Sequence, residues 1–155
     1  FDTVSWMNRA NRQLWRTNVH SNTGFINRFI RNTMKTIICD IDGTLVKYLG
    51  DVKGMTYGNA TPLPGVVEHL NRWEQEGHKI ILITGRRESL RKRTEKDLQE
   101  LAIPYDLLLM GYADSGRILI NDEGSKIKAH AVSLERDSGF VDYDWREVGL
   151  TKLKL

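Results

Sequence analysis

The amino-acid sequence predicts an α/β fold in which crossover helices cover a parallel β-sheet. From residue 35 onward, short apolar runs alternate with stretches of helical spacing, which is typical of parallel strands joined by helices. Most of these runs are almost continuously apolar, which indicates strands that are buried on both faces. We therefore expect a three-layer sandwich around a sheet of about five strands. The expected strands are 36–39, 80–83, 107–110, 118–120 and 131–134.

Two helices are expected between the first three of these strands. An apolar stripe at helical spacing runs through residues 66–73 and predicts a helix that ends before Gly77, a residue type common just past helix ends. We expect Trp73, which belongs to the stripe, to lie in the core. Residues 88–101 predict a second helix with a strongly basic start, and Pro104 follows its end.

The length and composition of the chain fit one domain. Its 155 residues are 40% hydrophobic, which is enough to bury a core without disulfides or a structural metal. Cys39 is the one cysteine, which excludes a disulfide scaffold and a cysteine-rich zinc site and fits a reducing compartment. The apolar runs are too short to span a membrane or to form a signal peptide. The sequence therefore predicts a soluble cytoplasmic protein with no membrane partner.

The positive charge of the chain is concentrated near its start. The net charge is +3, whereas residues 1–33 alone carry five arginines against one acidic residue, a net +4. We expect this segment to be a basic N-terminal arm, helical or irregular, that precedes a single domain at 34–155. The domain itself then has no basic excess, so nucleic acid is a possible partner but not the favoured one.

The first predicted strand ends in the run Cys39-Asp40-Ile41-Asp42-Gly43-Thr44-Leu45. Ligands of open α/β sheets bind beyond the carboxyl ends of the strands. Two acids held there would repel each other unless a cation or a shared proton neutralised them. Gly43 permits a sharp turn that brings backbone amides close to a bound anion. The alternative interpretation of this run is a plain Asp-Gly turn.

Two more strand ends carry polar groups. The strand at 80–83 is followed by Thr84, Gly85 and Arg86, and a hydroxyl with free amides at a helix start suits a phosphate oxygen. Arg86 could reach a substrate anion or remain solvated. The strand at 118–120 is followed by Asn121-Asp122-Glu123, whose carboxylates are hard oxygen ligands of the kind that Mg²⁺ prefers.

The run at 38–45, apolar-apolar-Asp-x-Asp-Gly-Thr-apolar, resembles the first motif of the haloacid dehalogenase (HAD) superfamily of phosphotransferases. The resemblance implies a Rossmann-like fold and an enzyme that works through an aspartyl-phosphate. It implies that Asp40 is the nucleophile and that Asp42 is the acid and base, and the presence of Asp42 favours a phosphatase over a dehalogenase. These roles agree with the general chemistry of carboxylates in phosphoryl transfer.

The same resemblance assigns the remaining site residues. It implies that Thr84 binds phosphate and that Mg²⁺ is held by Asp40, the backbone carbonyl of Asp42, and Asp122. The family also has a cation that neutralises the phosphoryl group, and Arg117 is favoured narrowly over Lys126 for this role. Lys92 is a third candidate for that cation. The expected substrate-binding residues are Gly43, Thr44, Gly85, Arg86 and Lys126.

The spacing of the motifs leaves no room for the cap domain that many HAD proteins carry. Residues 46–58, punctuated by glycines, predict a small β-hairpin flap instead. Small capless relatives act on sugar phosphates, so the leading prediction is a magnesium-dependent phosphomonoesterase that acts on a sugar phosphate or another phosphorylated metabolite. Capless relatives also form oligomers, and we expect a homo-oligomer in which a flap or arm covers a neighbouring site.

Two alternatives remain open at the level of sequence. One is a phosphatase of nucleic-acid ends in which the arm at 1–33 supplies the electrostatic attraction. The other is a non-catalytic HAD-like binding domain. The family has a lysine or arginine shortly before the fourth predicted strand, and in this chain that stretch contains no lysine and only one cation, Arg117.

Overall fold

The computed structural model describes residues 34–50, 54, 58–112, 116–122 and 129–155. The chain divides into two compact units, Phe1–Met34 and Lys35–Leu155, and every described helix and strand belongs to the second unit. The predicted arm at 1–33 lies outside the described residues.

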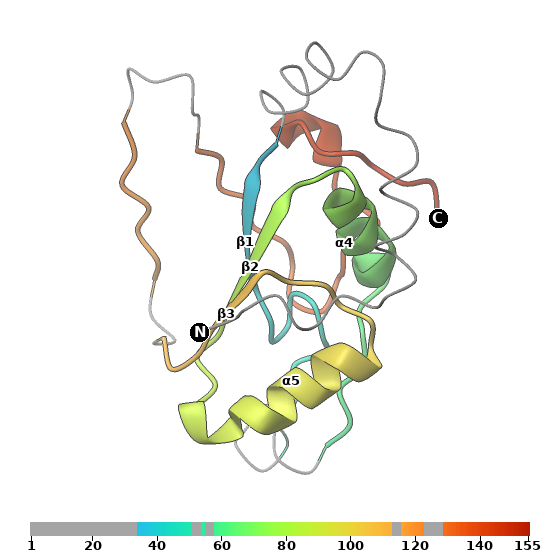
Figure 1. Ribbon diagram of the computed structural model, residues 1–155. Coiled ribbons are helices and arrows are strands. Elements are labelled where there is room, and N and C mark those ends of the chain that lie inside the picture. Colours follow the sequence, from blue (N-terminus) through green and yellow to red (C-terminus); the bar gives the residue numbers. More distant parts are fainter. Residues whose placement is uncertain (1–33, 51–53, 55–57, 113–115, 123–128) are drawn as a thin grey trace, which may run out of the picture. The chain divides into compact units, whose positions relative to one another are not determined.

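A parallel sheet of three strands in the order β1-β2-β3 forms the centre of the second unit (Figure 1). Its strands are β1 (Thr36–Asp40), β2 (Lys79–Ile83) and β3 (Leu107–Leu109). Asp40 pairs with Ile83, and Ile83 pairs with Leu109, so the carboxyl ends of the three strands are level. The α/β class, the parallel sheet and the first three predicted strands are thus confirmed.

The connections between the strands are helical, as predicted. Helix α4 (Val66–Gln75) joins β1 to β2, and Gly77 follows its end in the left-handed region with φ 88°. The 3₁₀ turn η1 (Glu88–Leu90) and helix α5 (Arg91–Glu100) join β2 to β3. Among the described helices, none has the length and apolar character that crossing a bilayer requires.

The described helices cover one face of the sheet rather than two. The buried residues Ile80 and Leu82 of β2 share one hydrophobic core with the buried residues of α4 and α5. On the opposite face, Ile38 is 53% exposed and Leu107 is 48% exposed. Both crossovers advance in the same direction across the sheet, and right-handed crossovers then place both helices on the same face. The expected three layers are therefore two within the described part of the chain.

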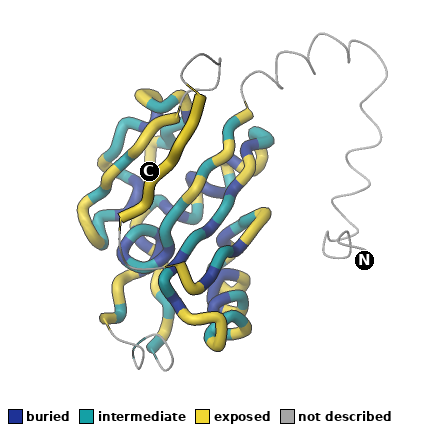
Figure 2. The backbone as a smooth tube through the Cα atoms, turned by 90° about the vertical axis from the view of Figure 1, so that its left-hand side faces the viewer, coloured by how far each residue is buried: buried dark blue, intermediate teal, exposed yellow. Residues whose placement is uncertain are grey.

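Two further predicted strands, 118–120 and 131–134, are not strands in the structure. Ile118, Leu119 and Ile120 are 89%, 65% and 91% exposed, and the segment 116–122 is exposed along its length (Figure 2). Their apolar character suggested burial, but these residues pair with no described strand, so the described sheet has three strands and not about five. Residues 131–134 alternate between exposed and half-buried, and two of them pack against the core.

The C-terminal segment packs against α4 through an aromatic cluster. The ring centroids of Trp73 and Trp145 are 4.9 Å apart, and those of Phe140 and Trp145 are 4.8 Å apart. Trp73, which is fully buried as expected, donates its indole N–H to the carbonyl of Thr151 at 2.8 Å. His69 is also fully buried and accepts the backbone N–H of Leu153 at 3.1 Å. This cluster holds the C-terminal segment against α4, which in turn contacts β2.

Candidate active site

Asp42 lies in a tight turn directly beyond β1. Ile41, Leu45 and Val46 are buried and anchor the turn, and the amides of Leu45 and Val46 donate to the carbonyl of Ile41 at 2.9 and 3.1 Å. Gly43 has φ 83°, in the left-handed region that glycine adopts without strain, and its amide donates to Val46 at 2.7 Å. The turn predicted from the Asp-Gly sequence is thus formed, and the Gly43 amide is engaged within it.

The base of the predicted flap is an antiparallel contact between the residues around Val46 and those around Pro62. The amide of Lys47 donates to Thr61 at 2.9 Å, and the amide of Leu63 donates to Leu45 at 2.9 Å. Of the predicted hairpin at 46–58, residues 51–53 and 55–57 lie outside the described residues, and residues 47–50 are not a strand.

Arg86 and Thr84 both contact the carboxylate of Asp42. The Arg86 guanidinium forms a fork, with Nε 2.9 Å from Oδ2 and Nη2 2.7 Å from Oδ1. The Thr84 hydroxyl donates to Oδ2 at 3.3 Å and accepts the Arg86 amide at 3.1 Å. The carboxyl ends of β1 and β2 therefore bring together three of the residues singled out from the sequence.

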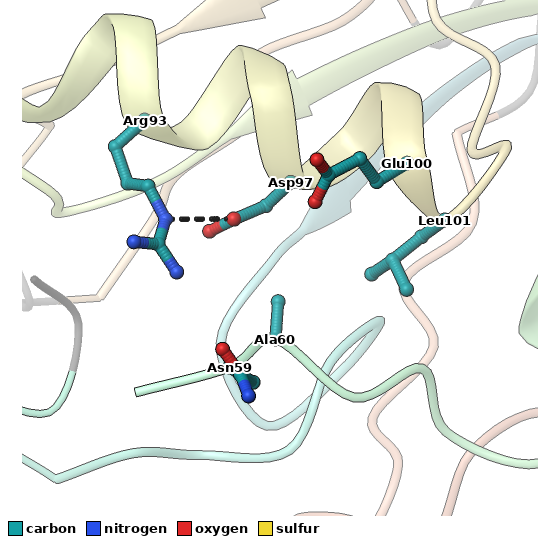
Figure 3. A pocket seen from close by; sticks show the side chains of 6 residues that line it. All are labelled: Asn59, Ala60, Arg93, Asp97, Glu100 and Leu101. Atoms are coloured by element: carbon teal, nitrogen blue, oxygen red, sulfur yellow. Dashed lines mark hydrogen bonds and ion pairs between the residues drawn. The ribbon is translucent and has the colours of Figure 1, made fainter. Parts of the chain in front are cut away.

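Arg86 belongs to a buried polar network and is not solvated. Its side chain is 2% exposed, Nη1 donates to the Thr94 hydroxyl at 3.2 Å, and Nη1 lies 3.9 Å from a carboxylate oxygen of Asp97. Asp97 pairs with Arg93 at 2.8 Å (Figure 3). Arg93 also donates to the carbonyl of Gly58 at 2.8 Å. This burial argues against both interpretations of Arg86 from the sequence, which were a solvated side chain and a direct ligand of the substrate.

A cavity of about 100 Å³ lies beside this network, between α5 and residues 59–60. Figure 3 shows Arg93 and Asp97 on its helical side. It has room for only a few waters, and no residue of the predicted site lines it, so it is not a substrate pocket. Its lining residues are Asn59, Ala60, Arg93, Asp97, Glu100 and Leu101.

Asp40, at the last position of β1, is partly exposed and contacts Arg117. A guanidinium nitrogen of Arg117 lies 2.8 Å from Oδ1 of Asp40, and the two side chains are 45% and 31% exposed. Lys126, the other candidate for the neutralising cation, lies outside the described residues, and Lys92 is exposed on α5. Burial, together with the charge of Asp40, raises the pKa of the adjacent Cys39 thiol to about 12, so this thiol stays protonated.

The predicted magnesium site consists of two carboxylates, those of Asp40 and Asp122, and the backbone carbonyl of Asp42. Within the described residues, no group of three or more His, Cys, Asp or Glu side chains is arranged to hold a metal ion. Asp122 is exposed, and Glu123 lies outside the described residues. Asp40 and Asp42 remain hard oxygen donors at the strand end, and Mg²⁺ commonly uses only one or two protein carboxylates with waters and substrate phosphate.

Three residues near the turn were not predicted from sequence. The amide of Asp137 donates to the carbonyl of Gly43 at 2.8 Å, and the Asp137 carboxylate accepts the amide of Tyr48 at 2.8 Å. Arg136 lies over the ring of Tyr48. Residues 135–138 are far from the turn in sequence and carry no motif, so no local signal could have placed them there.

A model of one protein family matches the chain. The match covers residues 34–118, slightly more than half of the chain, and the family is described as the polynucleotide kinase PNKP phosphatase domain. Among curated proteins, the comparison finds no match.

Several solved structures are similar to the chain. A protein of the Pnkp1/Rnl/Hen1 RNA repair complex is 36% identical with a TM-score of 0.46; the match covers 55% of this chain and 28% of that one. A Vibrio cholerae protein solved as a structural target is 26% identical with a TM-score of 0.48, and the match covers 74% and 94%. A Vibrio cholerae protein described as a 3-deoxy-D-manno-octulosonate 8-phosphate phosphatase is 25% identical with a TM-score of 0.36, and the match covers 56% and 45%. The chain thus spans less than a third of the repair-complex protein.

Proposed function

Since this chain belongs to the family of polynucleotide kinase phosphatase domains and is a HAD-like phosphoric monoester hydrolase, we propose that it removes a terminal phosphate from a polynucleotide. The observation that carries this proposal is the pair of carboxylates at the carboxyl end of β1, each bound by its own arginine. Asp40 is exposed enough to contact a substrate, whereas Asp42 forms an ion pair with the buried side chain of Arg86.

Two features support a polynucleotide over a small sugar phosphate. The family that matches residues 34–118 is named for a polynucleotide enzyme. Residues 1–33 carry a net charge of +4, which would attract a phosphate backbone.

We also propose that the site has no cap domain, since the β2–β3 connection, residues 84–106, holds only η1 and α5. An uncapped site is open to a long substrate.

The proposed reaction uses Asp40 and Asp42 in two steps. In the first step Asp42 starts as the carboxylic acid. An oxygen of Asp40 forms a bond to phosphorus while the bond from phosphorus to the leaving oxygen breaks, and Asp42 gives that oxygen its proton. Water then attacks the phosphorus of the aspartyl-phosphate and passes a proton to Asp42, while the bond from phosphorus to the Asp40 oxygen breaks. Inorganic phosphate leaves, and both side chains return to their starting states.

We assign Arg86 a positioning role toward Asp42. Its planar fork engages both carboxylate oxygens and fixes the plane of the carboxylate, which a lysine could not do. Arg117, which contacts Asp40 and is itself 45% exposed, is the proposed cation that faces the phosphoryl group. The Thr84 hydroxyl is buried and donates to Asp42 at 3.3 Å, and we propose that it turns from Asp42 to a phosphate oxygen when the substrate binds. We also propose that Gly43 and Thr44 in the turn, and Gly85 after β2, lie next to the bound phosphate through their backbone.

The donor set at the strand end fits Mg²⁺. We propose that the ion is held by the carboxylate of Asp40 and the backbone carbonyl of Asp42, with Asp122 as the predicted third protein ligand. When bound, Mg²⁺ supplies positive charge that stabilises the transferring phosphoryl group.

The test is a measurement of phosphate release from a panel of substrates with the whole chain. The panel contains single-stranded oligonucleotides with a 5′- or 3′-terminal phosphate, mononucleotides, sugar phosphates and p-nitrophenyl phosphate, each with Mg²⁺ and with excess chelator. We expect the highest kcat/KM on a phosphorylated oligonucleotide. Asp40→Asn removes the nucleophilic charge at nearly constant size and should abolish turnover, whereas the exposed Asp142→Asn, a matched change, should not.

Each alternative predicts a different result from this panel. Release from sugar phosphates but not from oligonucleotides would establish the metabolite phosphatase expected first from the sequence. No release from any substrate, with binding retained, would indicate a non-catalytic domain. A rate for Asp40→Asn above a tenth of the unmodified enzyme would exclude Asp40 as nucleophile.

A further inference from the structure

A cation and an aromatic ring lie together beside the turn that carries Asp42. The guanidinium carbon of Arg136 is 4.6 Å from the centroid of the Tyr48 ring. Tyr48 is 39% exposed, and Arg136 is exposed as well. Such stacking contributes about 0.5–1 kcal/mol at an exposed site, enough to favour one orientation of a long side chain.

Backbone hydrogen bonds hold this pair against the turn. Asp137 donates its amide to Gly43 and accepts the amide of Tyr48, both at 2.8 Å. Asp137 has φ 64°, an uncommon conformation for a residue other than glycine, and these two bonds fix it there. A Cβ placed on Gly43 would lie 3.0 Å from Cγ of Arg136. The Arg136 side chain therefore crosses directly over the residue that follows Asp42.

The hydrogen-bonding groups of Arg136 differ from those of the other arginines at this edge. Arg86 donates to Asp42, and Arg117 donates to Asp40. Within the described residues, no acceptor takes a hydrogen bond from the Arg136 guanidinium. Stacking on a ring leaves the N–H edges of a guanidinium pointing sideways, where they can bind a phosphate oxygen in a fork.

We infer that Arg136, oriented by Tyr48, binds the phosphodiester next to the terminal phosphate of a polynucleotide whose terminal phosphate lies at Asp40. This inference rests on the proposed function. Gly43 is three residues from Asp40, so the two Cα atoms are at most about 11 Å apart. Cγ and Cδ of Arg136 lie beside Gly43, so its guanidinium, two bonds further along the side chain, is near enough to meet the group attached to the reacting phosphate, while Arg117 contacts Asp40 itself.

The experiment compares three probes that differ in their second phosphate. The first is a short single-stranded oligonucleotide with a terminal phosphate, the second a nucleoside 3′,5′-bisphosphate, and the third p-nitrophenyl phosphate. The variants are Arg136→Ala, Arg136→Lys, Tyr48→Phe and Tyr48→Ala. The matched control is Arg72→Ala, which removes a half-exposed arginine from α4 near the opposite end of the sheet.

We expect Arg136→Ala to lower the ratio of kcat/KM for the oligonucleotide to that for p-nitrophenyl phosphate about tenfold, chiefly through KM. The slope of log KM against log salt for the oligonucleotide should fall by about 0.7, the loss of one phosphate contact with a single strand. Arg136→Lys should keep the salt slope of the unmodified enzyme and should lower the ratio of kcat/KM values less than Arg136→Ala does. Tyr48→Phe should retain the ratio because the ring remains, and Tyr48→Ala should lower it.

The contrary results are distinct. An equal loss on all three probes, or an unchanged salt slope, would make Arg136 a structural clamp for residues 135–138 and overturn the inference. A loss on the bisphosphate as large as on the oligonucleotide would assign Arg136 to a second phosphate of a small metabolite. If the unmodified enzyme cleaves p-nitrophenyl phosphate but no oligonucleotide, the proposed function fails first, independently of Arg136.

Discussion

Replacing Arg86 with alanine should lower the free energy of unfolding by about 3–5 kcal/mol, the range for removing one partner of a buried ion pair. The Arg86 side chain is 2% exposed, and its partners Asp42 and Asp97 are 11% and 10% exposed. Without Arg86, the Asp42 carboxylate remains largely buried and water replaces its lost donors poorly, whereas Asp97 loses a charge 3.9 Å away and keeps its hydrogen bond from Arg93. The lost charge pair, rather than the lost methylene groups, therefore dominates the change.

The assay is urea unfolding followed by circular dichroism. With a slope of about 2 kcal/mol/M, the expected loss moves the midpoint down by about 1.5–2.5 M. Arg87→Ala is the matched control: Arg87 is adjacent in sequence but exposed, so its loss should change stability by less than about 0.5 kcal/mol. In the double variant with Asp42→Asn, the loss should be smaller than the sum of the single losses because the stranded charge is gone. A loss below about 1 kcal/mol for Arg86→Ala, or an equal loss for Arg87→Ala, would refute the reasoning.

Three further predictions concern the charged groups of the domain. Arg117→Ala should lower kcat at least tenfold, more than Lys126→Ala, in steady-state phosphate release; equal and small effects would show that neither faces the phosphoryl group. Activity should vanish in excess chelator, and Asp122→Ala should raise the Mg²⁺ concentration for half-maximal activity many-fold; full activity without divalent ions would exclude the metal proposal. Burial lowers the pKa of His78, whose Nδ1 accepts the backbone N–H of Lys35 at 3.0 Å, so its stabilising contribution is present above about pH 6.5 and is lost as the pH falls. Unfolding from pH 7.5 to 5 should therefore show a smaller loss of stability for His78→Gln than for the unmodified chain, and an equal loss would contradict this.

The elements predicted correctly are those whose sequence pattern is local. Strand β1, the Asp42-Gly43 turn and helix α4 each follow from a short run of residues with a clear physical preference. The segment 118–120 shows the limit of this reasoning, because an apolar run predicts burial without saying which neighbour buries it. In the structure these residues are exposed and pair with no described strand.

In the candidate site, too, some residues could be predicted from local sequence and others could not. Asp40, Asp42 and Thr84 could be selected because each follows a predicted strand, and parallel strands place their carboxyl ends at one edge. The positions of Arg86 and Arg136 could not be predicted. Whether an arginine turns inward toward a carboxylate or outward to solvent depends on contacts between elements, such as the bond from Arg86 to Thr94 on α5.

The charge balance of the site explains why it needs more positive charge than its own arginines provide. Asp40 and Asp42 would repel each other without neutralising charges, and Arg117 and Arg86 supply one positive charge to each. With both carboxyls ionised these four groups sum to zero, and with the proton that Asp42 donates they sum to +1, whereas a phosphate monoester brings nearly two negative charges near neutral pH. Two unit charges 4 Å apart interact by about 4 kcal/mol at an effective dielectric constant of 20, so this imbalance is costly. A divalent cation at Asp40 would offset the charge of the terminal phosphate, and Arg136 would offset that of the next phosphate along the strand. The proposed Mg²⁺ and the proposed contact between Arg136 and the polynucleotide therefore both supply the positive charge that the substrate phosphates require, at two neighbouring places.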